Sequence, residues 1–253
     1  MTLYEALHID LNICELISLV GAGGKTSIMF RLAQELKASG KKVLVTTTTN
    51  IAFSEALQAD HLVIHSSKET CFLSNVEPGS IVCLGGGVWN DKGKLKGVDR
   101  ELISEIYQKH IFDYIVVEAD GSKRKPIKAP AQYEPVIPGE TTRTIGVIGL
   151  DALGKTITDE CVHRPNLFCA ITGKKIGETI DQKCIIDLIR SEDGLFKDVP
   201  QGCRKYVVFN KADHADREEE GIITANQLKE MQIPLNGLII AAIGKGYIYA
   251  TEH

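Results

Sequence analysis

The stretch that decides the fold is ELISLVGAGGKTSIMFRLAQELKASGKKVLVTTTTN, residues 15–50. The apolar runs Leu16–Val20 and Val43–Thr47 predict two buried strands. Between them, apolar residues recur with the period of one helix face, at Ile28, Met29, Leu32, Ala33 and Leu36. Gly40 stands where a helix end commonly needs a left-handed residue. Strand, helix and strand in this order indicate a βαβ unit and a parallel sheet.

The rest of the chain repeats this alternation. Further strands are predicted at His61–His65, Ser80–Leu84, Tyr114–Glu118, Thr144–Leu150, Tyr206–Asn210 and Leu238–Ile243. Further helices are predicted after Asp99, after Asp181 and near Thr224–Met231. Continuous apolar runs such as YIVVE indicate strands that are buried on both faces. We expect an α/β, doubly wound, mostly parallel sheet with helices on both faces. It should form one domain over residues 1–253, with an irregular embellishment at about 66–98 that includes a turn or hairpin at Asn90–Gly93.

Composition narrows the function classes. The chain has 253 residues and a formal net charge of -4, which argues against a nucleic-acid-binding protein. No apolar run is long enough to span a membrane, and the first residues do not resemble a secretory signal, so we expect a cytoplasmic protein. The seven cysteines include no C-x-x-C pair, which argues against a disulfide framework or zinc knuckle. We expect buried, reduced thiols, with a redox-active or selenium-handling cysteine as the alternative.

Two segments compete for the role of phosphate-binding loop. GAGGKT, Gly21–Thr26, is two residues shorter than the usual pattern G-x-x-x-x-G-K-[ST], whereas GLDALGKT, Gly149–Thr156, fits the pattern at every position. A phosphate loop needs a strand before it and a helix after it, because loop amides and the helix N-terminus face the phosphate. GAGGKT has both. After Lys155 the sequence has no helical stripe, and Pro165 argues against a helix there. We therefore predict that GAGGKT holds the phosphate in a P-loop NTPase-like domain and that GLDALGKT is a structural connection.

The expected nucleotide-binding residues at this loop are Gly21, Ala22, Gly23, Gly24, Lys25, Thr26 and Ser27. The Lys25 ammonium should reach the β- and γ-phosphates, and the Thr26 hydroxyl should bind Mg²⁺. The amides of Gly23 to Thr26 should surround the phosphate. The G-x-x-G-K-T spacing is similar to the GTNGKT loop of the Mur-type peptide ligases, which bind ATP.

Polar residues end two of the predicted strands. Four threonines, Thr46–Thr49, end the second strand, and Glu118 and Asp120 follow YIVV in the manner of a Walker B strand. In open α/β sheets ligands bind beyond the carboxyl ends of the strands. We expect Mg²⁺ to be held by Thr26, Thr47, Glu118 and Asp120. Lys25, Glu118 and Asp120 are the predicted catalytic residues.

A basic run follows the Walker B-like strand in EADGSKRKPIKAP. Lys123, Arg124 and Lys128 are predicted to bind an anion, either the nucleotide or a second substrate. The alternative is an ordinary solvated surface.

A later strand ends in Asn210-Lys211-Ala212-Asp213, which fits the N-K-x-D pattern of guanine-nucleotide binders. One carboxylate can accept both N1–H and N2–H₂ of guanine, whereas adenine offers no such pair of donors. Asn210, Lys211 and Asp213 are therefore predicted to contact the base, which favours GTP. The short loop favours ATP by analogy, and a loop with a helix N-cap is the alternative for NKAD.

The ordered set GAGGKT, VTTTTNI, EADGSKRKPIKAP with EPVIP, GLDALGK with HRP, and FNKAD resembles the YqeC-type accessory proteins of selenium-dependent molybdenum hydroxylases. The likeness covers about residues 15–215, and EADGSKRKPIKAP is its most specific part. It implies a cytoplasmic protein that uses a nucleotide while a molybdenum hydroxylase or its cofactor is assembled. Asn50 stands where this resemblance would place a lysine. The strand layout is also similar to metallochaperone GTPases, at the level of fold alone.

Three functions are compatible with these residues. The first is a Mg²⁺-dependent NTPase that acts in cofactor assembly, with Lys25, Thr26, Glu118 or Asp120, and Asp213 in the roles given above. The second is a transferase or ligase that holds a small anionic acceptor on the basic run. The third is a non-catalytic carrier or chaperone switched by the nucleotide. We prefer the first.

Overall fold

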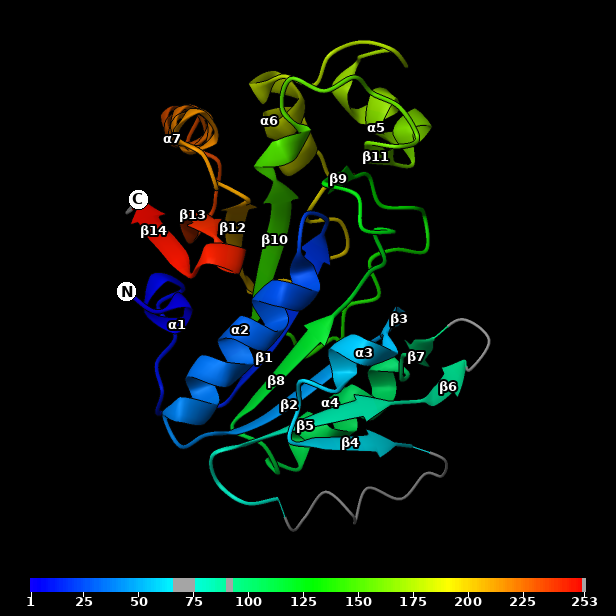
Figure 1. Cartoon of the computed structure of the whole chain (residues 1–253), viewed down its shortest axis with the longest axis vertical. Coiled ribbons are helices and arrows are strands. Elements are labelled where there is room, and N and C mark those ends of the chain that lie inside the picture. The colour runs from blue at the N-terminus through cyan, green and yellow to red at the C-terminus, as the bar shows by residue number, and fades with distance from the viewer. Residues whose placement is uncertain (66–75, 90–92, 252–253) are drawn as a thin grey trace.

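The computed structural model describes residues 1–65, 76–89 and 93–251. Its centre is a nine-stranded sheet, in which all described neighbours are parallel except the antiparallel pair at one edge (Figure 1). From that edge the strands are β14 (Tyr247–Thr251), β13 (Gly237–Ala242), β12 (Arg204–Asn210), β10 (Arg143–Gly149), β1 (Glu15–Gly21), β8 (Tyr114–Glu118), β2 (Lys42–Thr47), β5 (Ser80–Gly85) and β4 (His61–Ile64).

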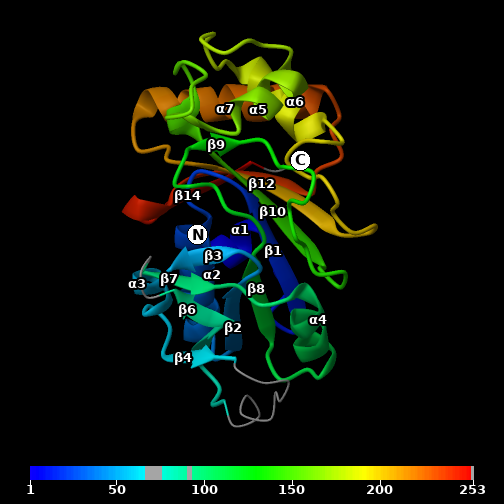
Figure 2. The same ribbon diagram turned by 90° about the vertical axis from the view of Figure 1, so that its right-hand side faces the viewer.

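Helices cover both faces of this sheet, because the apolar residues of each strand point alternately to the two sides. On one face α1 (Leu3–Ala6) and α2 (Lys25–Ala38) pack on residues such as Ile17, Leu19 and Val208. On the other face α4 (Arg100–Gln108) packs on one half of the sheet. The other half is covered by α5 (Pro165–Thr172), α6 (Gln182–Arg190) and α7 (Ala215–Glu230), which Figure 2 shows grouped together.

The strand order reverses around β1. After β1 the chain passes through α2 to β2 on one side, and after β8 it crosses to β10 on the other side. Such a switch point opens a crevice beyond the carboxyl ends of the central strands. Glu118, Gly149 and Asn210 all end strands at this edge. The topology therefore brings the predicted motifs together.

The predicted α/β fold with a mostly parallel sheet and helices on both faces is confirmed, and all eight predicted strands are present. The sequence analysis missed β14 at the edge. It also missed α5, which begins at Pro165, because proline is favoured at the first position of a helix although it is excluded from the interior. The helix predicted near Thr224–Met231 is longer and begins at Ala215.

A small antiparallel sheet lies beside the main one and consists of β3 (Asn50–Ala52), β7 (Lys94–Lys96) and β6 (Gly87–Trp89) (Figure 2). Part of the embellishment predicted at 66–98 therefore belongs to this sheet and part to β5 of the main sheet. The turn predicted at Asn90–Gly93 falls largely on residues 90–92, and these, like residues 66–75, lie outside the described residues. The remaining short elements are α3 (Phe53–Ala56), β9 (Ile127–Lys128) and β11 (Val162–His163).

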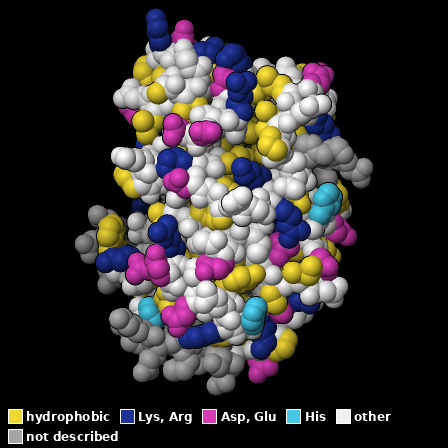
Figure 3. Space-filling view, turned by 180° about the vertical axis from the view of Figure 1, so that it is seen from behind, with side chains coloured by type: hydrophobic (Ala, Val, Ile, Leu, Met, Phe, Trp, Pro, Cys, Tyr) yellow, Lys and Arg dark blue, Asp and Glu magenta, His cyan; other side chains and the backbone are white. Residues whose placement is uncertain are grey.

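Lys and Arg side chains are interspersed with Asp and Glu on the face opposite to that of Figure 1 (Figure 3). The six described cysteines are free, and three of them, Cys83, Cys161 and Cys184, are buried. No helix among the described residues has the length and apolar character needed to cross a membrane.

Candidate functional site

The turn between β1 and α2 requires its glycines. Gly21 and Gly23 each have φ of +92° and Gly24 has φ of +119°, a region that side chains rarely adopt. A Cβ atom on Gly23 would lie 2.2 Å from the backbone nitrogen of Gly149, and one on Gly24 would lie 2.5 Å from Nδ2 of Asn210. The short loop is therefore pressed against the ends of β10 and β12.

The first turn of α2 presents free backbone donors. Gly24 is the N-cap, and no side chain caps the helix. Among the described residues no acceptor pairs with the N–H groups of Gly24, Lys25, Thr26 and Ser27. The amide of Gly23, which we had expected to face a phosphate, instead donates to the carbonyl of Lys125 at 3.1 Å.

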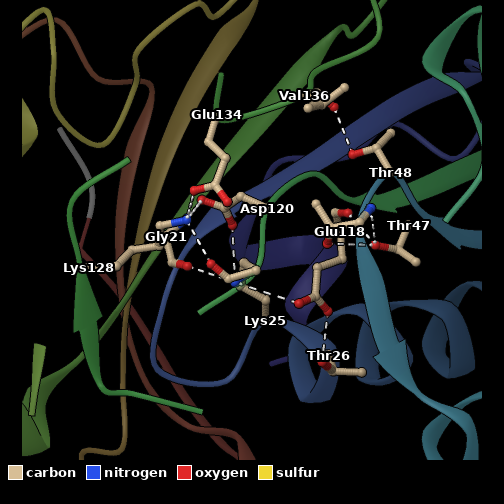
Figure 4. A network of polar contacts seen from close by, with 12 residues as sticks. Gly21, Lys25, Thr26, Thr47, Thr48, Glu118, Asp120, Lys128, Glu134 and Val136 are labelled. Carbon is tan, nitrogen blue, oxygen red and sulfur yellow. Dashed lines mark hydrogen bonds and ion pairs between the residues drawn. The ribbon is translucent and has the colours of Figure 1, made fainter. Parts of the chain in front are cut away.

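Lys25 is the centre of the site and is only 2% exposed. Its Nζ donates to the carbonyl of Gly21 at 2.7 Å and lies 3.1 Å from Oδ1 of Asp120 and 3.6 Å from Oε1 of Glu118 (Figure 4). Burial by itself would lower the pKa of Lys25, but the two carboxylates outweigh burial and raise it. Lys25 is thus a fixed, charged group at the carboxyl edge of the sheet.

Glu118 also meets the first turn of α2. The Thr26 hydroxyl donates to Oε2 of Glu118 at 2.7 Å. Burial raises the pKa of Glu118, while Lys25 and the bond from Thr26 oppose this rise. Thr47 does not face these oxygens, because its hydroxyl donates to the backbone carbonyl of Glu118 at 2.8 Å and accepts the amide of Thr49.

A chain of buried charges extends from Lys25 away from the helix (Figure 4). Oδ2 of Asp120 lies 2.9 Å from Nζ of Lys128, and Lys128 also lies 2.7 Å from Oε2 of Glu134. Arg164 donates to both carboxylate oxygens of Glu134 through its two terminal guanidinium nitrogens, at 2.6 and 2.9 Å. Lys128, which was predicted to bind an anion, is only 2% exposed. Its ammonium group already contacts Asp120, Glu134 and the carbonyl of Gly121.

The sequence analysis missed Glu134 and Arg164 as members of the site. They lie in the segments EPVIP and HRP, which the resemblance contained but to which no chemistry was assigned. Burial alone would raise the pKa of Glu134, but the contacts with Arg164 and Lys128 outweigh burial and lower it. The pairing therefore keeps the Glu134 carboxylate charged. The signal that could have found them is an acid and a base near an otherwise apolar, proline-rich stretch.

The NKAD segment is held next to the loop. Nδ2 of Asn210 donates to the carbonyl of Gly23 at 2.8 Å, and Oδ1 of Asn210 accepts the amide of Ile243 at 3.2 Å. Lys211 pairs with Asp151 at 2.9 Å. Asp213 is half-buried and its backbone carbonyl accepts Lys245. Asn210 therefore joins the glycine loop to the end of β13, while Asp213 keeps a carboxylate near the same edge.

A cavity of about 1400 Å³ is lined by Gly23–Ser27, Glu118 and Lys211. Its lining also includes Ser122–Lys125, Tyr133, His163 and Arg164, and the turn Ser122–Lys125 is bonded to the glycine loop through the amide of Gly23. Thr48–Ala52 and Glu55 line the cavity as well. Of the predicted anion-binding residues, Lys123 and Arg124 line the cavity.

His163 is a neutral group in this cationic wall. Burial, together with Arg164 and Lys128, lowers its pKa to about 4. The sequence analysis gave His163 no role, because it has no partner at metal-ligand spacing. No group of three or more His, Cys, Asp or Glu side chains with the arrangement of a metal centre occurs among the described residues.

Comparison with known proteins supports the resemblance. The family model described as YqeC protein matches residues 17–166. A curated relative from Escherichia coli strain K12, whose name is Uncharacterized protein YqeC, is 36% identical over 232 residues, which cover 90% of this chain and 88% of the relative. The matched region includes the glycine loop, the carboxylates after β8 and the Glu134–Arg164 pair. The chain belongs to the YqeC family.

Proposed function

We propose that this protein is a Mg²⁺-dependent nucleotide-binding protein that hydrolyses a nucleoside triphosphate during maturation of a selenium-dependent molybdenum hydroxylase. The pathway rests on the resemblance given above, and the chemistry rests on the residues. The partners of this proposal are the nucleotide and a molybdenum hydroxylase or its cofactor-assembly proteins.

One observation carries the proposal. A charged, buried lysine and four free backbone donors open the same helix, at the carboxyl edge of a parallel sheet and beneath a large cavity. Oriented amides and a fixed ammonium are the groups that hold phosphate in loops of this kind. On phosphate binding, Lys25 would exchange part of its contact with Asp120 and Glu118 for phosphate oxygens. Asp120 would keep Lys128 as its partner.

The oxygens around Thr26 fit a magnesium ion. The Thr26 hydroxyl and the Glu118 carboxylate are 2.7 Å apart and both line the cavity. Mg²⁺ prefers hard oxygen ligands and usually keeps several waters while it is held by one or two protein groups and the phosphates. Thr26 and Glu118 would therefore hold the ion, and Asp120 would contact Lys25 beside it. When bound, the ion would neutralise charge on the transferring phosphoryl group. Thr47 supports Glu118 through its backbone in this arrangement.

We further propose GTP as the preferred nucleotide. Asp213 has no hydrogen-bonded partner for its carboxylate among the described residues, and Asn210 holds its strand end against the glycine loop. A carboxylate at this position can accept the two donors of guanine. ATP remains the alternative nucleotide.

The test is a titration with fluorescent GTP and fluorescent ATP, with and without Mg²⁺, followed by phosphate release. Asp213→Ala should lose the preference for GTP, and Lys25→Ala should weaken the binding of both nucleotides roughly ten- to a hundredfold. Asn236→Ala, at an exposed turn, serves as a matched control and should change neither.

Three results would contradict parts of the proposal. Absence of binding for both nucleotides in the presence of Mg²⁺ would refute the nucleotide site. Tight ATP binding that ignores Asp213→Ala would refute the role of NKAD alone. Binding without any phosphate release, with or without an added acceptor, would favour a nucleotide-switched carrier.

A further inference from the structure

Part of the cavity wall is not explained by phosphate binding at the glycine loop. This wall is built from the turn Ser122–Lys125, from Tyr133, and from His163 and Arg164. None of these residues belongs to the glycine loop or to the first turn of α2, although the turn is bonded to the loop through the amide of Gly23.

Several positively charged residues that line the cavity have strained backbone conformations. Eight described non-glycine residues have positive φ, and four of these, all cationic, line this one cavity. They are Lys123 (φ +49°), Arg124 (φ +60°), Arg164 (φ +66°) and Lys211 (φ +67°). Strained positions of this kind persist only where the surrounding structure fixes them, and they cluster at active sites and ligand-binding sites.

Lys123 and Arg124 occupy the middle of a tight turn. The amide of Lys125 donates to the carbonyl of Ser122 at 3.0 Å, so both central residues of the turn have positive φ, where glycine or asparagine is normally found. The turn is held at both ends, because Lys128 donates to the carbonyl of Gly121 and Gly23 donates to the carbonyl of Lys125. Both cationic side chains are exposed and have no partner among the described residues. The turn thus presents two unpaired cations on a fixed support.

Arg164 and Tyr133 form the adjoining surface. Arg164 is fixed by its two bonds to Glu134, and its guanidinium lies 5.8 Å from the ring centre of Tyr133. Tyr133 is 74% exposed, although large aromatic side chains are usually covered. A flat ring can stack on such a tyrosine, and the neighbouring guanidinium increases the attraction of this surface for an electron-rich ring. His163, next in the chain to Arg164, also lines the cavity.

We infer that this wall is a second subsite, which binds a small organic anion that carries a flat ring. Lys123 and Arg124 pair with the anionic group, and Tyr133 stacks on the ring beside Arg164. The inference rests on the proposed function in one respect: the anion would be the second substrate, bound in the same cavity as the nucleotide. The formal net charge of the chain is -4. The positive charge at this wall is therefore local, and it comes from Lys123, Arg124 and Arg164.

The subsite is tested with the phosphate loop already filled. The protein is saturated with Mg²⁺ and the β,γ-imido form of whichever nucleotide binds, and is then titrated with phenyl phosphate by calorimetry. Inorganic phosphate and phenol serve as probes that carry only the charge or only the ring. We expect phenyl phosphate to bind more tightly than either.

Variants at Arg124 and Tyr133 identify the residues, and a lysine variant on α6 is the control. Arg124→Ala should weaken phenyl phosphate roughly ten- to a hundredfold, because a charged hydrogen bond is lost. Tyr133→Leu should weaken it by roughly fivefold, and Tyr133→Phe should not, since the ring is retained. Lys183→Ala, an exposed lysine on α6, is the matched control and should leave binding unchanged. Arg124→Gly should raise Tm while it loses phenyl phosphate affinity, because glycine accepts φ of +60° without strain.

Several outcomes would overturn the inference. One is that phenyl phosphate does not bind the loaded protein at millimolar concentration, and another is that Arg124→Ala and Tyr133→Leu bind it as tightly as the parent protein. A third contrary result is that Arg124→Ala weakens the nucleotide itself while phenyl phosphate does not bind, which would assign the turn to the nucleotide. If neither nucleotide binds, the proposed function fails, and the same titration on the ligand-free protein still decides the subsite.

Discussion

The two glycine-rich segments, Gly21–Thr26 and Gly149–Thr156, follow neighbouring parallel strands and form different structures. Gly21 of β1 is paired with Val147 of β10, so both segments leave the sheet at the same edge. After Gly24 a helix of 14 residues begins at once. After Gly149 the chain forms a single 3₁₀ turn, Leu150–Ala152, and then an irregular loop. Lys25 is buried on two carboxylates, whereas Lys155 and Thr156 are exposed.

This difference shows that the residues that follow a glycine-rich motif determine the structure that the motif forms. GAGGKT lacks two residues of the usual pattern but is followed by an amphipathic helix that packs on the sheet. GLDALGKT fits the pattern, but no apolar stripe follows it, and its Gly149 instead supports the first loop. The Gly149 amide donates to Pro126 at 2.9 Å, and its backbone leaves no space for a side chain on Gly23. The second segment is part of the wall against which the first is formed.

The largest difference between the two segments is expected when the lysine of each is replaced by alanine. Lys25→Ala should lower the free energy of unfolding by about 3–5 kcal/mol, because Asp120 and Glu118 lose a buried partner. It should also weaken nucleotide binding roughly ten- to a hundredfold. Lys155→Ala should stay within about 0.5 kcal/mol of the parent, as surface changes do. Urea unfolding and fluorescent nucleotide titration measure both effects.

Lys25→Arg provides the control for folding, because it keeps the buried charge while it changes the shape of the group that meets phosphate. The comparison would be reversed if Lys155→Ala lost the nucleotide and a folded Lys25 variant retained it.

A second test exchanges glycines. Gly23→Ala should destabilise the protein by roughly 3 kcal/mol, because the new Cβ atom would lie 2.2 Å from a backbone nitrogen at φ of +92°. Gly154→Ala should cost only about 1 kcal/mol, since Gly154 has φ of +74° but open space around it. Thermal unfolding of the two variants, with and without nucleotide, separates them. Equal losses of stability would show that conformation alone, and not the packing of the first loop, requires glycine.

A third test removes the residue that joins the first loop to its neighbours. Asn210→Ala leaves the carbonyl of Gly23 and the amide of Ile243 without their partner, which should cost about 2 kcal/mol. Nucleotide affinity should fall with it if the glycine loop is the phosphate site. Unchanged affinity in a destabilised but folded variant would mean that the position of the glycine loop does not matter for binding. Hydrogen exchange of the loop amides provides the independent measurement.

Much of the fold could be predicted from the sequence, because the strands near the centre are continuous apolar runs. β8 was predicted with its observed bounds, and the other seven predicted strands agree to within one or two residues. The edge strand β14 was missed, since YIYAT is a short alternating segment with no neighbour in sequence to indicate pairing. α5 was missed because proline was interpreted as a helix breaker where it begins a helix.

The site could be predicted only in part. Lys25, Thr26, Glu118 and Asp120 come together because strand ends at a switch point meet at one edge. The burial of Lys128 and its contacts with Glu134 and Arg164 depend on how three loops fold over one another, and no periodic pattern records this. Thr47 likewise stands at the predicted strand end, but its orientation toward the backbone of Glu118 is set by the turn that follows.

The smallest expected effect is a difference in pH response between the two regions. The first loop carries Lys25, whose pKa is raised, so its charge should not change between pH 4 and 6.5. The region after the second segment carries His163, whose pKa is lowered to about 4 by burial and by Arg164, Lys128 and Lys123, although Glu134 opposes them.

Between pH 4 and the unfolded value of about 6.5 the unfolded chain binds a proton that the folded protein does not. Stability should therefore rise with pH across this window and be fully gained above it. His163→Gln should flatten that part of the profile in chemical unfolding, while Lys155→Gln should leave it unchanged. A rising slope that persists in His163→Gln would assign the acid sensitivity to Glu134, whose pKa is lowered, and not to Glu118, whose raised pKa gives a slope of the opposite sign.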